Sequence, residues 1–218
     1  MKESLLKGGI PVAVALLLLV LVDLSTDAPI PTRLLDIVTA NVTADLLIVS
    51  VAFYSGIVRS NSLLLKWYTK YGLSAALMDT LIGVIYMCIA FELVQLLEEP
   101  RLVYFGLISV ATQLMGDLLF YLFFSAVPPR KNAVLDFFKA YAAEAKLGAL
   151  LGDTFLVIFA VLFSSALALI RTERYVTYVL IVAVYLLPYV LHTDTFDKAK
   201  VVPQETKTRR RHSLPSVR

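Results

Sequence analysis

The chain carries two aspartate–threonine pairs, each inside an apolar stretch long enough to cross a membrane. Asp79-Thr80 lies within SAALMDTLIGVIY, and Asp153-Thr154 lies within GALLGDTFLVIFA. A charged side chain at mid-bilayer costs about 2.5–3.5 kcal/mol on insertion scales, so acids at such positions are rare and mark sites of function or of helix association. Their chemistry there is either hydrogen bonding between helices or the binding of protons and cations.

Four aspartates lie in the inner and middle parts of the apolar stretches, and the flanking cationic residues predict that they occupy two depths. Asp79 and Asp153 follow the nearest lysine by nine and seven residues, which puts them about 10–14 Å from one membrane face. Asp45 and Asp117 lie about 20 Å from the same face. No span carries a lysine, arginine or histidine deep enough to pair with these acids. An unpaired carboxyl group in lipid is most stable in its neutral, protonated form.

Amide side chains accompany the deeper acids. Asn41 and Gln113 precede Asp45 and Asp117 by four residues, so each pair shares a helix face and is expected to form a hydrogen bond. Two interpretations remain open: protonated acids that hold helices together, or a proton or cation pathway along the helix interface. The residues of the candidate pathway are Asp45, Asp79, Asp117, Asp153, Asn41, Gln113 and Glu92.

The composition indicates which elements position these residues. Of the 218 residues 59% are hydrophobic and only 17% are charged, against about 25% charged in soluble domains. The sequence therefore predicts an all-α, polytopic transmembrane helix bundle over residues 1–191, because lipid requires every backbone polar group to be paired within its segment. The first span could pass for a signal peptide, but no small-residue cleavage site follows it, so we interpret it as uncleaved. The six expected spans are 8–24, 32–59, 71–98, 102–127, 147–170 and 175–191.

The spans contain a possible parallel tandem repeat of two helical hairpins, about 32–98 and 102–170. NVTADLLIV matches QLMGDLLFY at an offset of 72 residues, and the two aspartate–threonine pairs match at an offset of 74. Both copies run in the same direction, which predicts a pseudo-twofold axis along the membrane normal. A prolyl pair then precedes an amphipathic helix at about 132–146, which lies either on the bilayer surface or packed against the spans.

The cationic residues predict that both termini are cytoplasmic. In a six-span topology sixteen lysines and arginines fall on the side of the termini and four on the other side. Residues 192–218 form a polar, basic tail that we expect to be disordered. Arg209, Arg210 and Arg211 of this tail are candidates for binding anionic lipid headgroups. Ser213, in RRHSLP, is a candidate phosphorylation site that a phosphoserine-reading protein could bind.

Other classes of site have little support in the sequence. Cys88 is the single cysteine, so the chain can form neither an internal disulfide nor a two-cysteine metal site. No catalytic or phosphate-binding motif is present, so we expect no enzyme activity, cofactor, metal or nucleic-acid partner. Asn41 fits a glycosylation sequon but is expected to lie within lipid, where it would not be modified.

Three segments carry a resemblance to a known group of proteins: SAALMD from Ser74, GDLLF from Gly116, and NAVLDFFKAYAAE from Asn132. Over about residues 36–168 the chain resembles uncharacterised multi-pass membrane proteins of large DNA viruses of algae and protists, the nucleocytoplasmic large DNA virus type. Gly116 stands where their pattern has a histidine, which removes the group best suited to relay a proton to Asp117.

This resemblance brings no established activity with it. It implies a structural or assembly protein of a virion membrane or a host endomembrane, in which the intramembrane aspartates hold helices together. The alternative is a small proton or cation channel or transporter that uses the acidic residues of the two repeated hairpins.

Overall fold

The computed structural model describes residues 2–54, 62–145 and 147–192, and within them the chain is entirely helical, with no strand. Six helices are long and apolar enough to span a membrane. They are α1 (Lys2–Thr26), α2 (Leu34–Tyr54), α5 (Leu73–Val94), α6 (Leu102–Ala126), α8 (Leu147–Ala168) and α9 (Glu173–Leu191). Two shorter helices are α4 (Ser62–Tyr71) and α7 (Ala133–Ala145). The predicted class, an all-α bundle of six spans, is confirmed.

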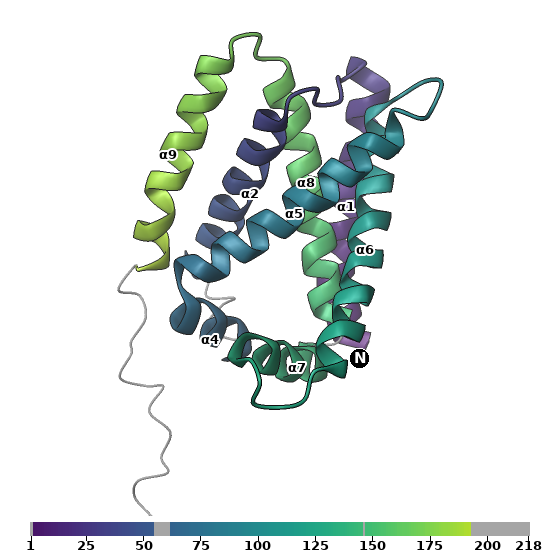
Figure 1. Cartoon of the computed structure of the whole chain (residues 1–218). Helices are drawn as coiled ribbons and strands as arrows, with labels where there is room; N and C mark the ends of the chain where they lie inside the picture. The colour runs from purple at the N-terminus through teal and green to yellow at the C-terminus, as the bar shows by residue number, and fades with distance from the viewer. Residues whose placement is uncertain (1, 55–61, 146, 193–218) are drawn as a thin grey trace, which may run out of the picture.

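Four of the spans form a closed ring in which each helix packs on two others. α2 contacts α5, α5 contacts α6, α6 contacts α8, and α8 contacts α2. α1 packs outside this ring on α8 and α6, and α9 packs outside it, mainly on α2 (Figure 1). Exchange of α2 with α6 and of α5 with α8 leaves this set of contacts unchanged. The arrangement therefore agrees with the expected pseudo-twofold axis, while the duplication itself stays a prediction.

The short helices occupy equivalent places in the two proposed repeats. α4 precedes α5 as α7 precedes α8, and both lie across one end of the bundle (Figure 1). α4 was not predicted, because its sequence runs directly into the following span. Gly72 separates the two helices: its φ of 50° lies in the left-handed region, which a glycine adopts at little cost. The third span accordingly begins at Leu73 and not at residue 71.

Helix α7 packs against the rest of the protein through aromatic rings. Phe137 stacks on Trp67 of α4, with centroids 4.9 Å apart and planes at 21°. Phe138 contacts Phe120 and Phe124 of α6 at 5.0 and 6.3 Å. Of the two placements expected for residues 132–146, these contacts favour a helix packed on its neighbours.

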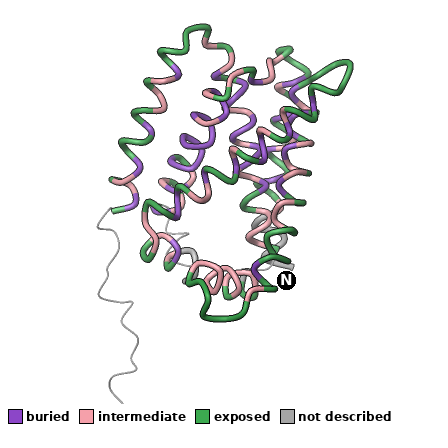
Figure 2. Tube along the Cα trace, in the orientation of Figure 1, coloured by how far each residue is buried: buried purple, intermediate pink, exposed green. Residues whose placement is uncertain are grey.

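The buried and exposed residues are distributed unevenly among the helices. Figure 2 shows buried residues concentrated along α2 and exposed residues along α9 and the lower half of α6. The exposed side chains of these two helices are largely apolar, as expected for surfaces that face lipid. The polar side chains of α2 are among its buried residues, so the ring encloses polar groups within an apolar exterior.

Two arginine–aspartate pairs lie at the end opposite α4 and α7. Arg33 binds Asp36 at 2.7 Å and also donates to the carbonyl oxygens of Leu167 and Ile170, which ties the start of α2 to the end of α8. The hydrogen bond to Asp36 raises the pKa of Arg33. Arg101, just before α6, pairs with the buried carboxylate of Asp23 in α1. These are the ion pairs among the described residues.

Candidate polar site inside the bundle

The four predicted acids lie on four different helices of the ring, and we call them the acidic cluster: Asp45 on α2, Asp79 on α5, Asp117 on α6 and Asp153 on α8. All four helices have the length and apolar composition of a membrane span, so the depth of each acid depends on its position along its helix. The contacts of each acid differ, and the differences bear on its chemistry.

Asp45 is buried between α2 and α5. Its side chain is 4% exposed, and its Oδ2 accepts a short hydrogen bond from the hydroxyl of Thr80. Thr80 is the threonine of the first aspartate–threonine pair, and it too is buried. The threonine of this pair therefore bonds to α2, whereas its aspartate has a partner on another helix.

Asp117 belongs to a chain of hydrogen bonds that crosses three helices. The hydroxyl of Tyr86 on α5 donates to its Oδ1 at 2.9 Å, and the amide of Gln113 donates to its Oδ2. The hydroxyl of Thr154 on α8 donates in turn to Oε1 of Gln113 at 2.9 Å. Thr154 thus links α8 to α6, as Thr80 links α5 to α2. Thr80 bonds to the acid directly, whereas Thr154 bonds to Gln113, one helical turn before Asp117.

Asp79 is covered by the short helix α4. The indole N–H of Trp67 donates to its Oδ2 at 3.1 Å, and the hydroxyl of Tyr68 lies 3.4 Å from the same oxygen. Trp67 is buried and Tyr68 is half-buried. Helix α4 therefore closes the bundle over this carboxyl group.

Asp153 has a different environment from the other three acids. Its side chain is exposed, and within the described part of the chain its carboxyl group forms neither a hydrogen bond nor an ion pair. It lies on α8, which packs against α2 and α6, the helices that carry Asp45 and Asp117. Asp153 is therefore the acid of the cluster that hydrogen bonds between the described residues do not account for.

Two tyrosines on the short helices also lie within reach of these charges. Burial, followed by the field of Asp79, raises the pKa of the Tyr68 hydroxyl. Burial, followed by the field of Asp153, raises the pKa of the Tyr141 hydroxyl on α7. Both phenols therefore stay protonated at neutral pH and are able to donate a hydrogen bond to a carboxylate.

Of the two hydrogen bonds expected for the deeper acids, one is present in the structure. The hydrogen bond between Gln113 and Asp117 is confirmed. The expected bond between Asn41 and Asp45 is wrong, since Asn41 donates to the carbonyl oxygen of Ile37 at 2.8 Å and to the sulfur of Met87 at 3.2 Å. The shorter amide reaches its own helix backbone, and its oxygen fills the space beside Gly83.

Glu92 does not join the acidic cluster. It is exposed in the last turn of α5, 13 residues beyond Asp79, which corresponds to about 20 Å along the helix. The candidates of the basic tail, Ser213 and Arg209 to Arg211, lie outside the described residues.

Sequence reasoning missed the aromatic partners of the acids. Tyr86 follows Asp79 by seven residues, two helical turns, so it lies on the same face of α5, and this spacing could have identified it. Its ring occupies the space beside Gly116, where any side chain would collide with it. Gly116 thus leaves room for a phenol that hydrogen-bonds to Asp117.

The arrangement suits protons better than a chelated metal. Among the described residues no three histidine, cysteine, aspartate or glutamate side chains come close enough to hold a metal ion together. Hydroxyl, amide and indole groups bond to three of the carboxyl groups instead. The hydroxyl groups of Thr80 and Tyr86 can both donate and accept hydrogen bonds, whereas the indole N–H of Trp67 only donates.

Comparison with known proteins adds no relative: no protein-family model, curated protein or solved structure matches the chain.

Proposed function

We propose that this integral membrane protein binds protons at the acidic cluster and passes them across part of the bilayer, as a small channel or as the coupling site of a transporter. The observation that carries the proposal is Asp153. This residue is exposed, has no hydrogen bond or ion pair among the described residues, and lies on α8, which packs against the helices of Asp45 and Asp117. A residue retained only to join helices would have a partner on another helix.

The absence of a cationic partner supports the same conclusion. The ion pairs in the described part of the chain use Asp23 and Asp36 at the far end of the bundle. The acidic cluster therefore has no described arginine or lysine to neutralise it, and its charge is balanced most simply by bound protons. Small hydrated cations are the second ligand that this chemistry admits.

A structural role in a viral or host membrane is the second candidate. Three acids of the cluster hydrogen-bond to a neighbouring helix: Asp45 to Thr80, Asp117 to Tyr86, and Asp79 to Trp67. Each such contact stabilises a membrane bundle by about 0.6–2 kcal/mol. These three acids would suffice for a protein whose function is to assemble, and they leave Asp153 unexplained.

Proton flux into liposomes separates the two functions. The full chain is reconstituted with a pH-sensitive dye inside, and a potassium gradient with valinomycin sets the membrane potential. We expect the wild type to acidify the lumen and Asp153→Asn to lower the rate at least tenfold. Glu92→Gln is the matched control, because it removes an exposed carboxylate outside the cluster, and its rate should equal that of the wild type.

The outcomes are distinct. Wild-type flux no faster than that of protein-free liposomes refutes proton conduction and leaves the structural role. Flux that survives the double variant Asp79→Asn with Asp153→Asn excludes these two residues from the pathway. Under the structural role alone, Asp153→Asn changes neither flux nor thermal stability, because this carboxyl group holds no described neighbour.

A further inference from the structure

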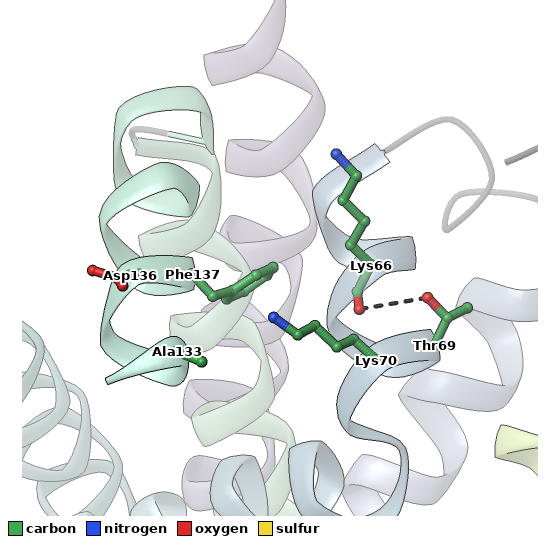
Figure 3. Close-up of a pocket in the computed structure, with 6 residues that line it drawn as sticks. All are labelled: Lys66, Thr69, Lys70, Ala133, Asp136 and Phe137. Atoms are coloured by element: carbon green, nitrogen blue, oxygen red, sulfur yellow. Dashed lines mark hydrogen bonds between the residues drawn. The ribbon is translucent and has the colours of Figure 1, made fainter. Parts of the chain in front are cut away.

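A hollow of about 400 Å³ opens between the two short helices, at the end of the bundle where α4 and α7 lie (Figure 3). Its lining residues are Lys66, Thr69, Lys70, Ala133, Asp136 and Phe137. Beside the hollow, the hydroxyl of Tyr71 donates to the carbonyl oxygen of Ala133 at 2.9 Å and so joins the end of α4 to the start of α7. Figure 3 shows Lys70 extending from α4 toward α7, and Phe137 extending from α7 toward α4.

The hollow has an excess of positive charge. Neither Lys66 nor Lys70 forms an ion pair with any described residue. The ammonium of Lys70 lies 5.0 Å from the centroid of the Tyr71 ring, which stabilises its charge without neutralising it. Asp136 is the one acid in the lining, and it points away from the lysines while its carboxylate accepts a hydrogen bond from the backbone N–H of Arg130 at 2.9 Å.

An apolar surface begins directly beside this charge. Helix α5 starts at Leu73, three residues after Lys70, and exposes Leu73, Leu77 and Leu81 along one face. These residues recur every four positions, so they form a continuous strip that faces lipid. A molecule with an anionic head and apolar chains would meet the two lysines and the leucine strip together.

We propose that the hollow binds the headgroup of an anionic phospholipid, with its phosphate between Lys66 and Lys70 and its acyl chains along α5. The site is separate from the acidic cluster and does not depend on the proposed function. It also lies at the end predicted to be cytoplasmic, where anionic lipids attract basic groups. Two lysines with no acidic partner can bind one phosphodiester. A small anion in water would not contact the adjoining leucines, whereas the acyl chains of a lipid would.

The single tryptophan of the chain reports on this site. Trp67 lies between Lys66 and Lys70 in sequence and stacks at 4.9 Å on Phe137, which lines the hollow. The full chain in neutral detergent is titrated with short-chain phosphatidylglycerol, and separately with short-chain phosphatidylcholine, at constant pH. We expect saturable change in Trp67 fluorescence with phosphatidylglycerol and none with phosphatidylcholine.

Substitution of the lysines tests the assignment. Each lysine near an anionic headgroup contributes roughly a fivefold factor, so Lys66→Gln with Lys70→Gln should weaken the apparent affinity by about 25-fold. The matched control, Arg130→Gln with Lys131→Gln, removes the same charge from the same end of the bundle without altering the lining, and should change the affinity less than threefold. Lys66→Arg with Lys70→Arg, which keeps both charges, should still bind phosphatidylglycerol, because the proposal requires the positive charges at these two positions.

Three results overturn the proposal. One is equal weakening in the lining and control variants, which means that only the general charge of this end matters. Another is unchanged affinity after both lysines are replaced. The last is an identical Trp67 response to inorganic phosphate at the same concentration, which assigns the hollow to a free anion.

Discussion

Two glycines directly precede acids of the cluster, Gly116 before Asp117 and Gly152 before Asp153, and the structure predicts opposite effects when each becomes alanine. A Cβ at Gly116 would lie 2.7 Å from Cζ and 2.8 Å from the hydroxyl oxygen of Tyr86, closer than carbon and oxygen atoms approach. A Cβ at Gly152 would have no atom within 4 Å. The two substitutions add the same methyl group to the same type of helix, so their difference measures the packing of Tyr86.

The magnitudes follow from three contributions. Replacement of a helical glycine by alanine stabilises by about 0.5–1 kcal/mol, and this is the whole expected effect at Gly152. At Gly116 the ring of Tyr86 must move, which costs about 1–3 kcal/mol as overpacking. Its 2.9 Å hydrogen bond to Asp117 is lost as well, at about 1–2 kcal/mol. Gly116→Ala should therefore destabilise by about 1–4 kcal/mol.

Reversible unfolding in mixed micelles by sodium dodecyl sulfate, followed by circular dichroism, measures both effects. The Tyr86→Leu background supplies a further check, because it removes the ring that obstructs the new methyl group. There Gly116→Ala should lose its penalty, and the double-mutant cycle should show at least about 1 kcal/mol of coupling. The reasoning is refuted if Gly116→Ala is as stable as the wild type, or if its cost persists without Tyr86.

Further predictions concern the other contacts between helices and the topology. Arg101→Gln leaves the buried carboxylate of Asp23 without its ion pair, and should cost about 1–3 kcal/mol in the same unfolding assay; adding Asp23→Asn should restore part of the loss, and no restoration would mean that the pair is not the cause. Thr154→Val removes the hydrogen bond to Gln113 and should cost about 0.6–2 kcal/mol, whereas Thr154→Ser should keep most of it; equal losses would assign the effect to the methyl group. Reporter fusions at the two termini should both give a cytoplasmic signal, since sixteen of twenty cationic residues then fall on that side, and a signal from opposite sides would disprove the six-span topology.

The spans could be predicted closely because membrane insertion depends on a one-dimensional property, the length of an apolar stretch. The fourth span was expected at 102–127 and is found at Leu102–Ala126. The length of an apolar stretch does not reveal helix α4, because Ser62–Tyr71 joins the next span without an intervening polar or prolyl stretch. Its boundary depends on one backbone angle at Gly72, and apolar length carries no information about that angle.

The depth of each acid was predictable and its lateral partners were not. Spacing along a helix fixes how far Asp79 or Asp117 lies from a membrane face. Which side chain of another helix reaches it depends on how the helices rotate and cross, and this is set by packing over the whole bundle. Trp67 is an example: it lies outside the predicted spans, and only the packing of α4 on α5 brings its N–H to Asp79.

The acids in or beside the spans have two kinds of described partner. Asp23 and Asp36 lie at one end, and each is matched with an arginine, which is how a fixed negative charge is stabilised in a bundle. Asp45, Asp79 and Asp117 are given hydroxyl, indole and amide donors instead. These donors also favour the ionised carboxylate, but unlike arginine they bring no positive charge to balance it. The described contacts thus separate two acids paired with arginine at one end of the bundle from acids that have no arginine or lysine partner within it, and the proposed proton binding rests on this second group.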